Sequence, residues 1–140
     1  MADSPSKRII FDTSTLVSAI LKPQSIPAQA LMWGWEVAEV VVSDEALDEL
    51  RQVLERDRLD RFRDRPSRLE FFAYYAAMTV LCPATQTVIA CRDPKDDKFL
   101  SLAVSANASV LISSDNDLLT LGRMGGTVII RPGQFVALCE

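Results

Sequence analysis

Residues 8–23 read RIIFDTSTLVSAILKP and join two patterns with no loop between them. The β-branched and aromatic run over residues 8–12 predicts a short buried strand. Apolar residues then recur at helical spacing, so a helix should follow at once and end at Lys22-Pro23. These apolar residues are Leu16, Val17, Ile20 and Leu21. The stretch is therefore a strand that feeds a helix, with Asp12 at the junction.

The same alternation of strand and helix continues along the chain. Strand patterns cover residues 40–42, 87–90, 110–113 and 128–130. Helical patterns cover residues 27–36, 44–54, 66–81, 96–106 and 132–139. Strands that are apolar on both faces and alternate with helices predict an α/β fold of a single domain over residues 1–140. We expect a three-layer α/β/α sandwich around a five-stranded, mainly parallel sheet.

One helix has an inward face that can be specified in advance. The helix that begins at Pro66-Ser67 and is closed by Cys82-Pro83 carries a stripe of apolar residues. We expect the stripe to face the core; its members are Leu69, Phe72, Ala73, Ala76 and Ala77.

Composition excludes several kinds of active site. The 140-residue chain has no histidine, three cysteines and a formal net charge of −4. Without histidine there is no Ser-His-Asp or Cys-His arrangement and no imidazole metal ligand. Cys82, Cys91 and Cys139 form no Cys-x-x-Cys pair, so we expect reduced, structural thiols rather than a zinc site. Any chemistry must then rest on carboxylates.

Two further features indicate where the protein works. No apolar run reaches the roughly 18 residues that span a bilayer, and the N-terminus lacks the apolar stretch of a signal peptide. We therefore expect a cytoplasmic protein with no membrane partner.

Four acidic residues stand out by their position. Asp12 closes the first strand, and Asp115 follows the strand at 110–113. Glu49 lies about 40° from the edge of the apolar stripe of its helix, nearer than Asp48. Asp96 precedes apolar residues at i+3, i+4 and i+7, so it lies on the buried face of its helix and needs a partner there.

Each of these acids also has a structural interpretation. Asp12 could be only a helix cap, and Glu49 only a residue at the edge of the buried face. Asp93, before Pro94, is expected to form a turn. Of the pair after the fourth strand, we assign the helix cap to Asp117, which leaves Asp115 for an acidic cluster.

A parallel sheet collects the carboxyl ends of its strands at one edge, so acids far apart in sequence can converge there. Carboxylates packed together repel one another, and a hard cation such as Mg²⁺ or Mn²⁺ is the usual means of keeping them ionised. The acids therefore predict a divalent-metal site.

Residues 51–68 form a basic stretch in an acidic chain. Seven arginines face four acids there, a local charge of +3. Such a stretch could follow a phosphate backbone, and we name Arg61, Arg63 and Arg65 as candidate RNA contacts. The alternative is a solvated helical hairpin with Arg–Asp pairs. Likewise, Trp33-Gly34-Trp35 could stack bases, but it is more often core or a dimer surface.

Taken in order, four motifs resemble those of the PIN-domain family. They are Ile-Ile-Phe-Asp12-Thr-Ser, the helix with Glu49, Asp93-Pro-Lys-Asp96-Asp-Lys-Phe-Leu, and Val-Leu-Ile-Ser113-Ser-Asp115-Asn-Asp. The resemblance spans nearly the whole chain and is closest to stand-alone prokaryotic PIN proteins described as toxin components of toxin–antitoxin systems.

The resemblance implies a sheet in the order 3-2-1-4-5 and a Mg²⁺- or Mn²⁺-dependent ribonuclease acting on single-stranded RNA. It implies an acidic quartet of Asp12, Glu49, Asp96 and Asp115. Of these, Asp12, Asp96 and Asp115 would bind either one metal ion or two. It also implies a supporting group around the quartet, a cognate antitoxin and a homodimer. The supporting residues are Ser14, Ser113 and Asp117.

Three other classes of protein fit the sequence less well. A Mg²⁺-dependent phosphoacceptor domain would need an acidic pair after the first strand, where this chain has Asp12-Thr13-Ser14. A haloacid-dehalogenase-like phosphatase would need Asp-x-Asp there, and a dinucleotide-binding module would need glycines. A catalytically silent PIN fold that binds RNA or protein is the remaining alternative, and an intact quartet counts against it.

Overall fold

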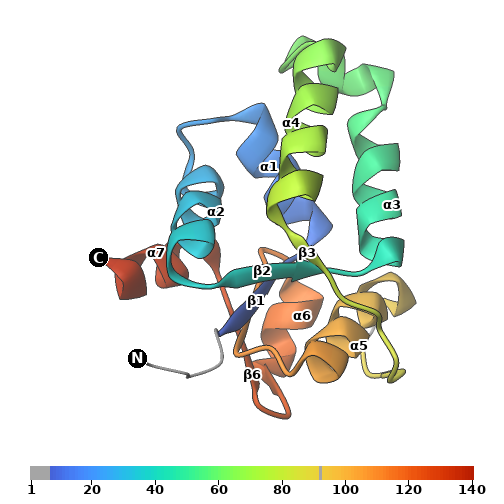
Figure 1. Ribbon diagram of the computed structural model, residues 1–140, viewed down its shortest axis with the longest axis vertical. Coiled ribbons are helices and arrows are strands. Elements are labelled where there is room, and N and C mark those ends of the chain that lie inside the picture. Colours follow the sequence, from blue (N-terminus) through green and yellow to red (C-terminus); the bar gives the residue numbers. More distant parts are fainter. Residues whose placement is uncertain (1–6, 92) are drawn as a thin grey trace.

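The computed structural model describes residues 7–91 and 93–140 (Figure 1). Its strands are β1 (Arg8–Phe11), β2 (Glu39–Val42), β3 (Val80–Leu81), β4 (Val110–Ile112), β5 (Arg123–Met124) and β6 (Thr127–Ile130). Its α-helices are α1 (Thr13–Leu21), α2 (Ile26–Val37), α3 (Asp44–Leu54), α4 (Arg65–Met78), α5 (Asp97–Ala106), α6 (Asn116–Leu121) and α7 (Pro132–Cys139). Two 3-10 helices are η1 (Asp57–Arg61) and η2 (Pro94–Asp96).

Within these residues the strands form one sheet in the order β3-β2-β1-β4-β6-β5. Strands β3, β2, β1, β4 and β6 are parallel to one another. Their order confirms the predicted 3-2-1-4-5, with β6 as the fifth parallel strand. The short β5 was not predicted; it pairs antiparallel with β6. The hairpin between them turns at Gly125, whose φ of 59° suits glycine.

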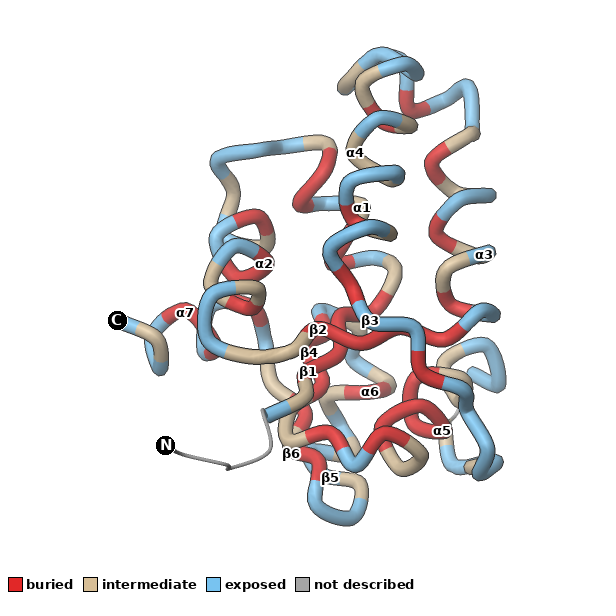
Figure 2. Tube along the Cα trace, in the orientation of Figure 1, coloured by how far each residue is buried: buried red, intermediate tan, exposed pale blue. Residues whose placement is uncertain are grey.

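The layers follow the prediction of helices on both faces of the sheet. Figure 1 shows α1 and α2 on one side and α5 and α6 on the other, with α3 and α4 rising side by side as a hairpin. Buried residues concentrate along the central strands, whereas the far end of the α3–α4 hairpin is mostly exposed (Figure 2). None of the described helices is long and apolar enough to cross a bilayer.

The third strand was predicted in the wrong place. It is β3, which follows α4 directly and pairs Val80 with Val41 of β2. Residues 87–90 instead form an irregular segment bound to α5, where the backbone N–H of Val88 donates to the Ser101 hydroxyl at 2.9 Å. The helix before β3 ends at Met78, short of the Cys82-Pro83 pair, because its last three predicted residues pair with β2 or lead into that pairing.

The predicted inward face of α4 was wrong in part, although Phe72 does pack, partly buried, against the core. Ala73 and Ala77 are exposed, while Arg68 and Tyr75 are the buried residues of the helix. The Arg68 side chain is fully buried and donates to the carbonyl oxygens of Leu54, Arg63 and Arg56 and to Asp60 Oδ1. These acceptors belong to the last residue of α3 and to the turn that follows it, so Arg68 holds the two helices of the hairpin together.

Helix α2 packs closely on the central strand. Gly34 is buried, and a Cβ placed on it would lie 2.8 Å from Ile9 Cδ1 and 3.0 Å from the Phe11 ring. Trp35 packs edge-on against Tyr74 with ring centroids 5.4 Å apart. The core interpretation of Trp33-Gly34-Trp35 is therefore confirmed.

Candidate metal-dependent active site

The sheet places the ends of β1 and β4 side by side, and the site begins there. Phe11 pairs with Ile112, and the Asp12 backbone N–H donates to the Ile112 carbonyl at 3.1 Å. Ser113, the residue directly after β4, is fully buried, and its hydroxyl donates a hydrogen bond to Asp12 Oδ2. Two positions 101 residues apart in sequence thus share one hydrogen bond.

Asp12 is both a helix cap and a buried carboxylate of the site. Its Oδ1 accepts the Thr15 backbone N–H at 2.9 Å, which caps α1, and the Ser14 hydroxyl lies 3.4 Å away. Burial raises the pKa of Asp12; hydrogen bonds from Ser113 and Thr15 oppose the rise, and the charge of Asp115 adds to it. The cap interpretation is right but does not exclude a functional one, since the second oxygen faces Ser113.

The assignment of the α6 cap to Asp117 was wrong. Asp115 is the N-cap, and its Oδ1 accepts the Asp117 backbone N–H at 2.7 Å. The Ser113 hydroxyl in turn accepts the Asp115 backbone N–H at 2.9 Å. A single hydroxyl therefore fixes both Asp12 and the start of the loop that carries Asp115.

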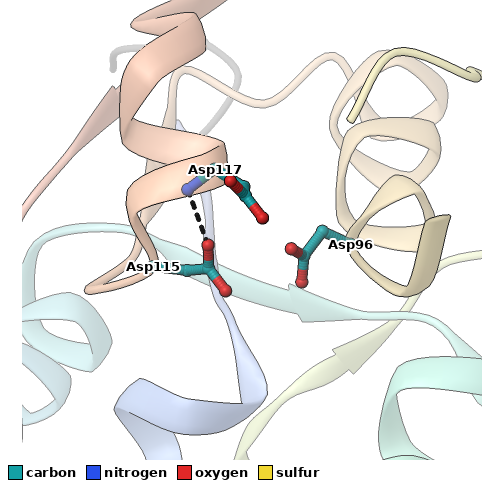
Figure 3. A group of neighbouring side chains, drawn as sticks. All are labelled: Asp96, Asp115 and Asp117. Atoms are coloured by element: carbon teal, nitrogen blue, oxygen red, sulfur yellow. Dashed lines mark hydrogen bonds between the residues drawn. The ribbon is translucent and has the colours of Figure 1, made fainter. Parts of the chain in front are cut away.

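Three carboxylates converge beside this hydroxyl. Asp96, Asp115 and Asp117 each offer an oxygen, and these oxygens all lie within 4.8 Å of one another (Figure 3). Asp115 and Asp117 come from the start of α6, and Asp96 faces them from the end of η2, at the start of α5. Asp117 is the member that sequence reasoning underrated; the Asp-Asn-Asp spacing at 115–117 was its only signal.

Asp96 is the carboxylate whose environment most clearly calls for a cation. Among the described residues its Oδ2 is buried and has no hydrogen-bond partner. Burial, followed by the charges of Asp115, Asp93 and Asp12, raises the pKa of Asp96 to about 6. Oxygen donors in mutual repulsion, one of them unpartnered, fit a hard divalent ion such as Mg²⁺ or Mn²⁺.

Glu49 lies apart from these three carboxylates. Its Oε1 accepts the Thr13 hydroxyl, and its Oε2 lies 2.9 Å from Lys98 Nζ. The described residues thus place Glu49 between α1 and α5, engaged at both oxygens. Lys98 was not singled out in the sequence, because its i+2 position after Asp96 matches no expected ligand pattern.

A groove of about 510 Å³ opens beside Glu49 and Lys98. Its lining mixes acids from α3 with bases from η2, from α5 and from the turn after α3: Glu45, Asp48, Glu49, Gln52, Val53, Arg56, Lys95 and Lys98.

The remaining acids of this region organise the backbone. Asp93 accepts the Lys95 backbone N–H at 3.0 Å, as expected of a turn former. Asp97 accepts the backbone N–H groups of Ala90 and Cys91, which hold the irregular segment to α5 and lower the pKa of Asp97.

The three candidate RNA-contact arginines lie on or beside the α3–α4 hairpin. Arg63 donates to the Ile20 carbonyl at 2.7 Å, Arg65 lies 3.5 Å from Glu55, and Arg61 lies over the Phe62 ring. Their RNA role stays a prediction.

Known proteins resemble this chain in sequence and in fold. The family model described as PIN domain matches residues 8–117. The uncharacterized protein MJ1680 of Methanocaldococcus jannaschii is 26% identical over 116 residues, covering 81% of this chain and 74% of that protein.

Among solved structures, VapBC2 from Rickettsia felis bound to a promoter DNA fragment superposes with a TM-score of 0.62 at 16% identity. The match covers 89% of this chain and 98% of that chain. The PIN domain of RRP44 from T. brucei matches with a TM-score of 0.48 at 14% identity, over 96% of this chain and 81% of that one. The first likeness shows the fold, and the family match over most of the chain shows that this protein belongs to the PIN-domain family.

Proposed function

We propose that this protein is a metal-dependent endoribonuclease that hydrolyses phosphodiester bonds of single-stranded RNA. The observation that carries the proposal is the group of Asp96, Asp115 and Asp117, with one buried Asp96 oxygen left without a partner in the described residues. PIN-domain proteins are in general nucleases, which agrees with a cluster of carboxylates beside a buried hydroxyl.

Asp96, Asp115 and Asp117 would hold Mg²⁺ or Mn²⁺. Asp12 would support this group indirectly, because the Ser113 hydroxyl donates to Asp12 and accepts the Asp115 backbone N–H. When bound, the cation neutralises charge on the phosphate oxygens and makes a nearby water easier to deprotonate. No side chain need form a covalent intermediate, since water can attack phosphorus and the bond to the leaving sugar oxygen then breaks.

The protein's own residues would set the geometry of this reaction. Ser113 fixes Asp12 and the Asp115 backbone together, so the acids do not have to be ordered when substrate arrives. The unpartnered Asp96 oxygen can accept a hydrogen bond from a water and orient it toward the phosphate. Glu49 would act in the same reaction from the wall of the groove.

Two partners belong to the same proposal. VapBC2 is a toxin–antitoxin complex, and the shared fold supports a cognate antitoxin for this chain. A homodimer is supported by exposed apolar side chains on the packed helices α2 and α7, where Met32 and Leu138 are 64% and 76% exposed. Sedimentation would test the dimer, and a monomer at micromolar concentration would contradict it.

The enzyme is tested by cleavage of assorted single-stranded RNAs with Mn²⁺. We expect Asp12→Asn, Asp96→Asn and Asp115→Asn each to lower the rate by about 100-fold or more, because each weakens the site that stabilises charge at phosphorus. Glu70→Gln, an exposed acid on α4, is the matched control and should cleave like the wild type.

Two results would count against the enzyme. Cleavage that continues without metal and is untouched by all three substitutions would reject the site. RNA binding with no cleavage under any metal would favour the catalytically silent alternative. Replacing Arg61, Arg63 and Arg65 together by alanine tests their proposed RNA contact, and unchanged affinity at low salt would remove it.

A further inference from the structure

The ion pair between Lys98 and Glu49 is a second charged feature beside the acidic cluster, and the proposed hydrolysis gives Lys98 no part. Lys98 Nζ lies 2.9 Å from Glu49 Oε2 and also donates to the Lys95 carbonyl. The Lys98 side chain is only 9% exposed. A lysine held in this way is a fixed charge rather than a mobile surface cation.

Both oxygens of Glu49 already have partners. Thr13 donates its hydroxyl to Oε1, and Lys98 takes Oε2. Asp96, by contrast, keeps a buried oxygen with no partner among the described residues. Asp96 and Glu49 are therefore not equivalent. Asp96 has an oxygen free to bind a metal cation, whereas Glu49 is already paired with the ammonium group of Lys98.

The charge of Lys98 acts on the acidic cluster as well as on Glu49. Lys98 follows Asp96 by two residues at the start of α5, so its positive charge lies near the acidic cluster. A second divalent ion placed against Glu49 would approach an ammonium of the same sign, which opposes its binding.

The same ammonium borders the open groove. Lys98 lines the cavity of about 510 Å³ beside α3, and it also lines a neighbouring cavity of about 240 Å³ between α5 and the irregular segment. A substrate phosphate that enters either cavity meets this charge, and in the larger cavity it meets it beside Glu49.

We propose that Lys98 takes the place of a second metal ion: by pairing with Glu49 it limits the site to one divalent ion and presents its own positive charge to the substrate phosphate. Lys98 is in this sense a positioning residue. Its role toward phosphate rests on the proposed nuclease function, whereas its effect on metal stoichiometry does not.

The test counts bound Mn²⁺ by electron paramagnetic resonance and titration calorimetry on the full chain, without RNA. Wild type should bind one ion. Lys98→Met should bind a second ion, because it frees Glu49, and the double variant Lys98→Met/Glu49→Gln should return to one. Lys98→Arg, which keeps the charge, should stay at one, and Glu49→Gln alone should leave the affinity of the single ion unchanged.

Two ions in the wild type, or one ion of unchanged affinity in Lys98→Met with a native circular dichroism spectrum, would overturn the proposal. If Lys98→Met does not fold, Lys98→Arg and Glu49→Gln still decide it, since a lost or weakened ion in Glu49→Gln would make Glu49 a metal ligand. Failure of the nuclease proposal has a different signature: the wild type would bind no ion, or would bind one that Asp96→Asn does not disturb.

Discussion

At the scale of single residues, the Ser113 hydroxyl connects the two halves of the site. It donates to Asp12 Oδ2 and accepts the Asp115 backbone N–H. A buried hydroxyl that makes both hydrogen bonds holds two chain segments in place. Its removal leaves the Asp12 oxygen and the Asp115 N–H each short of a hydrogen-bond partner. The sequence could place Ser113 at a strand end, but the double contact depends on how β1 and β4 meet.

Ser113→Ala should therefore impair stability and activity together. We expect a loss of about 1–3 kcal/mol in the free energy of unfolding, because a buried carboxylate oxygen and a backbone N–H each lose a partner. Urea unfolding measures the loss. Ser114→Ala, at the exposed neighbouring position, is the control, and equal stability of the two variants would show that the hydroxyl is dispensable.

Asp96 makes metal binding depend on pH. Its pKa is raised from 3.8 to about 6, chiefly by burial and then by Asp115, so the folded protein holds this proton more tightly than the unfolded chain. In the metal-free protein this group therefore lowers stability as pH rises from about 4 to about 6. Metal binding needs the ionised form, so Mn²⁺ affinity should rise over the same interval.

Titrations of Mn²⁺ between about pH 5 and about pH 8 check this dependence. We expect the affinity to weaken steadily below about pH 6 and to level off above it. An affinity that stays constant through this interval would mean that no carboxylate with a raised pKa takes part in binding.

At the scale of elements, the pattern of strands and helices was predictable where apolar periodicity decides it. Helix α1 starts and ends as expected, and α7 covers the predicted residues 132–139. Strand β3 was missed because its two residues are too few to show the alternation of apolar and polar side chains typical of a strand. They form a strand only by pairing with β2. The inward face of α4 was missed because a buried arginine defeats any rule based on apolar side chains.

Arg68 gives the sharpest prediction at this scale. Arg68→Ala removes the donor to three carbonyl oxygens and to Asp60, so we expect a loss on the order of 3 kcal/mol in the free energy of unfolding. Arg68→Lys should recover only part of it, since one ammonium cannot reach all these acceptors.

Arg58→Ala supplies the comparison, because Arg58 is exposed on η1 in the same hairpin. Chemical denaturation of the three variants gives the ranking. If Arg68→Ala is no less stable than Arg58→Ala, the hairpin is held by its apolar contacts and not by the guanidinium.

At the scale of the whole molecule, sheet topology explains what sequence could and could not foresee about the site. Parallel order puts the ends of β1 and β4 together, so the meeting of Asp12 with the residues after β4 was predictable. The double part of Asp115, which caps α6 and also lies in the cluster with Asp117, was not predictable, because a cap and a cluster member look alike in sequence. The pairing of Glu49 with Lys98 depends on how α3 packs against α5, which no local pattern encodes.

The most direct measurement is an anomalous difference map from a crystal of this protein soaked in Mn²⁺. The arrangement of carboxylates predicts a peak among the oxygens of Asp96, Asp115 and Asp117, with Glu49 still paired to Lys98. A peak at Glu49 with the three aspartates bare, or no peak near any of these acids at millimolar Mn²⁺, would contradict a metal-dependent active site at this edge of the sheet.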